Sequence, residues 1–127
     1  MKLSMEDEPY YKEYKEFTEQ CSAGNVSAEQ VGSVIVRMAQ YFAQKNMELS
    51  LAESSANGEA VLIVQSNDDS TGKPMSVSKA EILLKGTAAY EASNMVKTHI
   101  QNIEQYINAL KYLQKGILNE YSHMGNS

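Results

Sequence analysis

The sequence is short of residues on which several common functions depend. Tryptophan is absent, aromatic residues make up 8% of the 127 residues, and Cys21 is the only cysteine. A single cysteine excludes an intrachain disulfide and does not point to an oxidising compartment. We interpret Cys21 as a small buried hydrophobe, with a reactive thiol as the less favoured alternative. We therefore predict a domain built on an ordinary apolar core, which a chain of this length can form.

Basic residues and long apolar runs are also scarce. The chain has 11 lysines and arginines against 16 acidic residues, which argues against a nucleic-acid backbone as the main partner. No run approaches the roughly 18 to 20 apolar residues of a membrane span. Met1 to Glu8 turns acidic and has no apolar stretch, so we expect no secretory signal. We expect a cytoplasmic protein without a membrane partner.

Motifs that carry chemistry are missing as well. There is no phosphate-binding glycine loop, paired-cysteine metal motif or nucleophile elbow. Neither His99 nor His123 has a cysteine, histidine or acid three or four residues later, so we predict no metal site and no cofactor. His99 flanks an apolar seam and is expected to be partly buried, and His123 falls in a polar tail. We predict no catalytic residues and no enzymatic activity.

Residues 9–22 have the pattern of a short amphipathic helix. Pro9 stands where a missing N–H costs nothing, and Gly24 supplies a stop. An apolar stripe recurs at spacings of four, three and four, formed by Tyr10, Tyr14, Phe17 and Cys21. Because a helix this short is marginal alone, we expect it to dock on the rest of the chain.

A long helix is predicted over about residues 28–66. Ser27 to Gln30 has the pattern of a capping box. The run Val61 to Val64 also suits a short buried strand, and Gly58 costs about 1 kcal/mol inside a helix, but we favour the helix. Its heptad seam consists of Val31, Ile35, Met38, Phe42, Lys45, Leu49, Ala52, Ala56, Glu59 and Ile63.

A second long helix is predicted over about residues 78–121, after an exposed connector at residues 67–75. Ser78 to Glu81 has the pattern of a capping box that opens it. One seam row, with a strict period of seven, is Ile82, Ala89, Val96, Ile103, Leu110 and Ile117. The companion row is Gly86, Ser93, Ile100, Ile107, Gln114 and Tyr121.

These elements predict an all-α fold, a long antiparallel helical hairpin with a short N-terminal helix, within a single helical domain. The expected parts are a docking segment 1–26, the hairpin 27–121 and a flexible tail 122–127. Folding the two seams together sets small residues against small near the connector and large against large farther away.

Apolar residues outside the seams predict a homo-oligomer with coiled-coil character. The off-seam residues are Val34, Tyr41, Leu51, Leu62, Leu84, Met95, Tyr106, Tyr112 and Leu118. The candidate partner or oligomer contacts are Tyr10, Tyr14, Phe17, Tyr106, Tyr112 and Leu118. Weak candidate contacts to an anionic ligand are Lys97, Lys111 and Lys115.

Three segments resemble a family of small helical proteins encoded by tailed bacteriophages and prophages. They are SAEQVGSVIVRMAQYFAQ at 27–44, GKPMSVSKAE at 72–81 and NIEQYINALKYLQKGILNEYSHM at 102–124. The resemblance covers about residues 27–124, and its motifs are structural ones that bring no catalytic residues. It implies expression in the cytoplasm of an infected bacterium.

Our leading hypothesis is a noncatalytic phage accessory protein that acts by protein–protein contact, on host machinery or within a phage assembly. One alternative is a helical oligomer that sequesters a small ligand such as a nucleotide, as an antagonist of host defence. A third is an accessory to phage DNA metabolism that touches single strands through Lys111, Tyr112 and Lys115.

Overall fold

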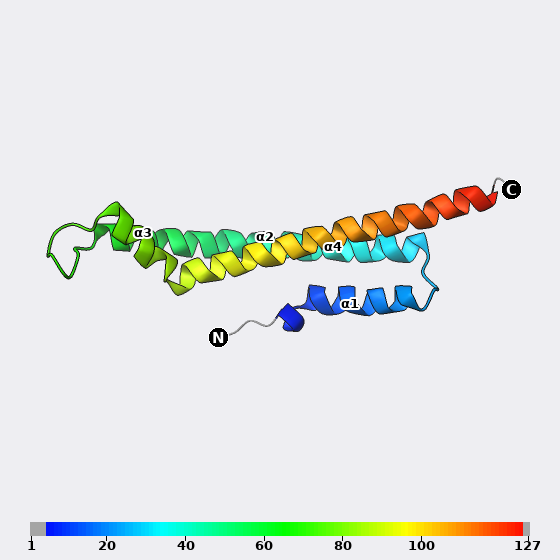
Figure 1. The fold of residues 1–127 in the computed structure, drawn as a ribbon, viewed down its shortest axis with the longest axis horizontal. Helices are drawn as coiled ribbons and strands as arrows, with labels where there is room; N and C mark the ends of the chain where they lie inside the picture. The colour runs from blue at the N-terminus through cyan, green and yellow to red at the C-terminus, as the bar shows by residue number, and fades with distance from the viewer. Residues whose placement is uncertain (1–4, 126–127) are drawn as a thin grey trace. The chain divides into compact units, whose positions relative to one another are not determined.

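The described part of the chain is predominantly helical. The computed structural model describes residues 5–125, with side chains described as far as Glu120. Helix makes up 84% of it, with no strand among the described residues, and α2 and α4 run antiparallel and pack against each other (Figure 1). The predicted all-α helical hairpin is therefore confirmed. The elements are η1 Met5–Asp7, α1 Pro9–Ser22, α2 Ala28–Gln65, α3 Val77–Lys85 and α4 Ala88–Gly125.

The internal contacts define two compact units, to both of which the two long helices contribute. The α1 unit contains η1, α1, the part of α2 up to Ala43 and the part of α4 from Gln101 onward. The α3 unit, Gln44–Ile100, contains the end of α2, the connector, α3 and the start of α4.

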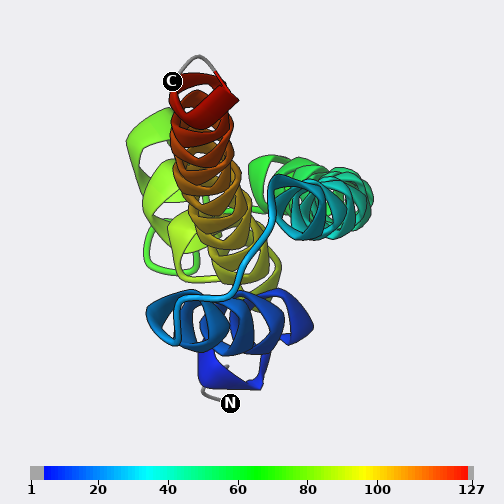
Figure 2. The same ribbon diagram turned by 90° about the vertical axis from the view of Figure 1, so that its right-hand side faces the viewer.

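The α1 unit holds the main apolar core, with α1 alongside the paired long helices (Figure 2). The heptad rows predicted its members from α2 and α4, except Val34. That residue was expected to be uncovered but is 2% exposed, because α1 adds a third helix to this core. The buried cluster consists of Tyr10, Phe17, Val31, Val34, Met38, Ile103 and Leu110.

Polar contacts tie α1 to both long helices of this unit. Arg37 Nε in α2 donates to Glu13 Oε1 in α1. Asn102 Nδ2 in α4 donates to Tyr10 Oη at 3.4 Å. Since Tyr10 is fully buried, the amide of Asn102 gives its hydroxyl the partner that burial demands.

One glycine permits a close approach between the long helices. Gln114 Nε2 in α4 donates to the backbone carbonyl of Ala28 at 3.1 Å. A Cβ at Gly32 would lie only 3.1 Å from the same Nε2. A larger residue at this position would therefore crowd the amide that satisfies a carbonyl in the first turn of α2.

The helix boundaries follow local chemistry. The N–H of Ser27 donates to Gln30 Oε1 at 2.8 Å, and the N–H of Gln30 donates to Ser27 Oγ at 3.1 Å, which confirms the predicted capping box. α1 begins at Pro9, and Gly24, with φ of 92°, follows its end. α2 remains helical through the Val61–Val64 run. The prediction that this run is helix and not strand is therefore confirmed.

The second long segment is divided at Gly86 and Thr87, where the sequence predicted an unbroken helix. Thr87 Oγ1 accepts a hydrogen bond from the N–H of Tyr90 at 3.2 Å and so caps a new helix, α4. The break resets the helical phase, so the seven-residue row does not extend back across it. Ile82, predicted in the seam, is 71% exposed.

The cap of α3 also differs from the prediction. Its N-cap is Ser76, whose Oγ accepts a hydrogen bond from the N–H of Lys79 at 3.3 Å, and not Ser78. Ser76 follows Pro74 and Met75 in extended backbone, the conformation that an N-cap adopts. α3 therefore starts one residue earlier than the predicted helix.

The α3 unit has an interior of small and polar residues. Its buried apolar residues are Ala56, Ala80 and Ile100, and it also buries Ser93 and His99, which are 3% and 6% exposed. The burial of His99 agrees with its predicted place beside the seam, whereas the side chain of His123 lies outside the described part. Fewer large apolar side chains are fully buried in this unit than in the α1 unit.

We expect Ile103→Asp to destabilise the protein by more than about 3 kcal/mol, because it places an unpaired charge in the core. Ile103 is fully buried in α4. Gln105→Asp, on the exposed face of the same helix, is the matched control and should cost less than about 1 kcal/mol. Urea unfolding of the two variants measures the difference, and equal losses would contradict this description of the core.

Candidate functional site

Exposed large apolar side chains concentrate in the α3 unit. Of the 13 such residues in the described chain, eight lie within Gln44–Ile100. They occupy the C-terminal half of α2 and all of α3, and they are Met47, Leu51, Val61, Leu62, Val64, Val77, Ile82 and Leu83. Exposed large apolar side chains in this number mark a site of protein interaction more often than a site of catalysis.

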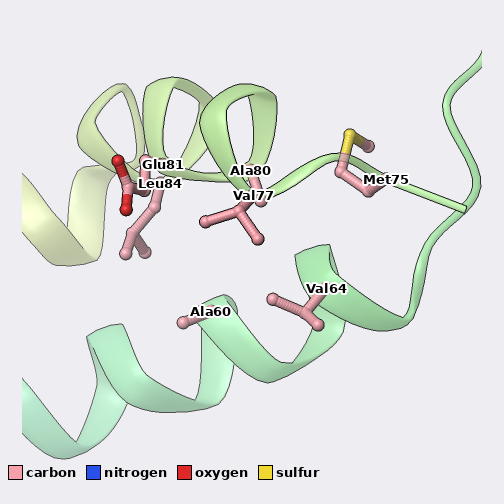
Figure 3. Close-up of a pocket in the computed structure, with 7 residues that line it drawn as sticks. All are labelled: Ala60, Val64, Met75, Val77, Ala80, Glu81 and Leu84. Atoms are coloured by element: carbon pink, nitrogen blue, oxygen red, sulfur yellow. The ribbon is translucent and has the colours of Figure 1, made fainter.

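An open-sided apolar pocket of about 130 Å³ lies between α2 and α3. In Figure 3, Ala60 and Val64 of α2 lie across from Val77, Ala80 and Leu84 of α3, and Met75 lies on the connector at one end of the pocket. Glu81 is the only ionisable residue in its lining. This pocket can accept an aliphatic side chain, but it offers no cation to an anionic ligand.

The connector between α2 and α3 is organised around Asp68. Its carboxylate Oδ1 accepts hydrogen bonds from Lys79 Nζ at 2.6 Å, Ser70 Oγ at 2.6 Å and the Ser70 N–H at 2.9 Å. Its carbonyl accepts from the N–H of Gly72 at 2.7 Å, and its own N–H donates to the carbonyl of Lys73 at 2.7 Å. The exposed connector is thus an ordered loop whose main polar link to α3 is Lys79.

The Lys79 ammonium, followed by the Ser70 donors, lowers the pKa of Asp68 from its ordinary 3.8 to about 2. The sequence did not predict that Asp68 and Lys79 form an ion pair. The Asp-Asp-Ser run at 68–70 is typical of a turn that an aspartate side chain stabilises. Asp68 and Lys79 are 11 residues apart in the sequence, so no local pattern predicts their contact.

The aromatic candidates of α1 lie inside the α1 unit. Tyr10 and Phe17 are buried in the core. The rings of Tyr14 and Tyr106 stack with centroids 3.9 Å apart, and burial raises the pKa of both hydroxyls. Contact between Tyr10 or Phe17 and a partner would require α1 to move, so in this arrangement they stabilise the chain itself.

Cys21 and Leu118, also in the α1 unit, differ in exposure. Cys21 is half-buried and packs against the core, and burial raises the pKa of its thiol. This agrees with a small hydrophobe, since a raised pKa leaves less thiolate. Leu118 is 54% exposed and remains available to a partner.

The candidate anion contacts lie on the surface of α4. Lys111, Tyr112 and Lys115 line a shallow depression together with Asn108, and Tyr112 is 78% exposed. Lys97 is exposed on the same helix but belongs to the α3 unit. The structure therefore groups Lys111 and Lys115 around an accessible ring and does not group Lys97 with them.

Across residues 5–120 no three histidine, cysteine, aspartate or glutamate side chains converge as a metal-binding set. Within the described chain no helix is both long and apolar enough to span a membrane. Comparison with protein-family models, with curated proteins and with solved structures finds no match to this chain.

Replacing Lys79 should remove the interaction that contributes most to the lowered pKa of Asp68. We expect Lys79→Met to move the pKa of Asp68 from about 2 back toward its ordinary 3.8, measured by NMR titration of the side-chain carboxyl. Because ionised Asp68 favours the folded loop, its contribution to stability is complete above about pH 4 and is lost as the pH falls toward 2.

Lys73→Met is the matched control, since Lys73 meets Asp68 through its backbone carbonyl. It should leave the Asp68 titration unchanged. An unchanged titration in Lys79→Met would contradict the assigned pairing.

Proposed function

We propose that this chain is a noncatalytic protein that acts by protein–protein contact and that its first partner is a second copy of itself. The observation that carries the proposal is the exposed apolar surface of the α3 unit, formed by α2 and α3. In keeping with the resemblance of its sequence, the protein acts in the cytoplasm of an infected bacterium, on host machinery or within a phage assembly.

The energetic argument for association concerns the apolar side chains that the single chain leaves exposed. Fully burying one Val, Leu or Ile side chain contributes about 1.5–3 kcal/mol. Eight large apolar side chains of the α3 unit are exposed, four of them from 69% to 76% (Met47, Leu51, Val77 and Ile82). Association that covers even half of them would supply several kcal/mol toward the cost of immobilising a partner.

Protein contact has more support than sequestration of a nucleotide. The apolar pocket between α2 and α3 is small and has Glu81 in its lining, and a carboxylate repels phosphate. The lysines at 111 and 115 flank an open surface on one helix and do not enclose a ligand. A strand-binding role through this surface would show itself as salt-dependent retention of oligonucleotides.

We expect light scattering coupled to gel filtration to give at least twice the 14.1 kDa chain mass at micromolar concentration. The apolar surface should be shielded from solvent in that assembly, so a dye that binds exposed apolar surface should bind more as the protein is diluted. A mass of 14.1 kDa at every concentration would overturn self-association.

A further inference from the structure

Four tyrosines gather in the α1 unit, and two of them are in direct contact. The rings of Tyr14 in α1 and Tyr106 in α4 are stacked, with centroids 3.9 Å apart and planes 3° from parallel. Aromatic pairs in proteins usually have centroids roughly 4.5–7 Å apart, so these two rings touch over their faces. The ring of Tyr10 is farther from Tyr106, with centroids 5.9 Å apart and planes inclined by 49°.

The hydroxyl groups of these side chains also lie close together. Burial contributes most to the raised pKa of Tyr106, and three neighbouring phenols add to it, Tyr10, Tyr11 and Tyr14. Because a charge acts more strongly at short range, the Tyr106 hydroxyl lies near the other three. Burial also raises the pKa of Tyr14. Both stacked residues are therefore neutral phenols at physiological pH, and both are half-buried and not sealed from small solutes.

Oxidation of two touching phenols joins them covalently. Each phenol loses one electron and its hydroxyl proton and becomes a phenoxyl radical, whose unpaired electron is shared with the ring carbons ortho to the oxygen. Two such radicals form a carbon–carbon bond between ortho carbons, and the hydrogens of those carbons move to the oxygens, which restores both phenols. The product, dityrosine, has two hydrogens fewer than two tyrosines. The two electrons pass to a peroxo compound: persulfate becomes two sulfate ions while both protons go to water, whereas hydrogen peroxide takes up both protons and becomes two waters.

The geometry favours coupling within the stacked pair. Rings that already touch bring their ortho carbons together by rotation of the side chains, with both helices in place. Tyr10 is less suited, because it is fully buried, its hydroxyl accepts a hydrogen bond from Asn102, and its ring is the more distant. A radical formed on Tyr106 therefore meets Tyr14 first.

We propose that Tyr14 and Tyr106 form a site of oxidative crosslinking, at which a one-electron oxidant supplied by a peroxo compound joins α1 covalently to α4. The bond closes a loop that contains most of the chain, and so restricts the unfolded state as a disulfide does. It also keeps α1 on the core. Since contact between Tyr10 or Phe17 and a partner requires α1 to move, the oxidised chain keeps both residues inside. Both rings belong to a single chain, so this inference is independent of the proposed self-association.

The test oxidises the full chain with persulfate and a photoactivated ruthenium tris-bipyridine complex, and then digests it with trypsin. Trypsin cuts after lysine and arginine and places the two tyrosines on separate peptides, 13–15 and 98–111. We expect mass spectrometry to find these two peptides joined, with a mass two hydrogens below their sum. Tyr10 and Tyr11 fall together on another peptide, 3–12, so their products are distinguished from this one.

Tyr14→Phe keeps a ring in the stack but removes the hydroxyl, so the joined peptide should be lost. Tyr41→Phe is the matched control, because Tyr41 is another partly buried tyrosine packed against the same core, and it should retain the product. The oxidised wild type should melt about 10 °C above oxidised Tyr14→Phe, since only the wild type has the closed loop. Comparison of the two oxidised proteins cancels the effect of oxidation at other side chains.

An equal mixture of isotope-labelled and unlabelled protein shows whether the bond lies within one chain. Joined peptides that carry a single isotope support the proposal, whereas joined peptides of mixed isotope would place α1 on α4 of another copy and overturn it. The proposal is also wrong if 13–15 is not joined to 98–111, or if Tyr14→Phe yields as much crosslink to 98–111 as Tyr41→Phe. A main product that joins 3–12 to 98–111 would show that the stacked pair does not direct the coupling.

Discussion

A pair of helices can bury only the stripe that each turns toward the other, and the rest of this structure depends on how that limit is met. In the α1 unit a third helix supplies Tyr10 and Phe17, and with them even the off-seam Val34 is buried. In the α3 unit the added helix is only nine residues long, and the interior consists of Ala56, Ala80, Ile100 and two polar residues. Among the described residues the α3 unit therefore keeps eight large apolar side chains exposed, against five in the α1 unit.

Polar contacts in the connector and at the helix caps help to determine which side chains of the α3 unit are exposed. Asp68 gathers the backbone of its own loop and the ammonium of Lys79, and Ser76 and Thr87 cap the two helices that follow. Because α3 ends at Lys85 and α4 begins afresh at Ala88, Ile82 is not carried into the seam and faces solvent. The cap at Thr87 thus leaves Ile82 outside the buried seam.

The distribution of exposed residues favours contact with protein over binding of a small anion. An apolar pocket lined by Ala60, Val64, Leu84 and their neighbours suits an aliphatic side chain, and its one ionisable lining residue is acidic.

The sequence alone determined the helices, because caps and periodicity are local. Pro9, Gly24 and the Ser27–Gln30 box set boundaries that the structure reproduces, and the heptad rows identified Met38, Ile103 and Leu110 as core. The break at Thr87 is also local, but the seven-residue rows run through it and so hid it. Only the tertiary structure decided the pairing of Asp68 with Lys79 and the burial of Val34 in the core that α1 completes. These two depend on which segments meet in space, and a periodic pattern carries no information about a third helix or a contact across a turn.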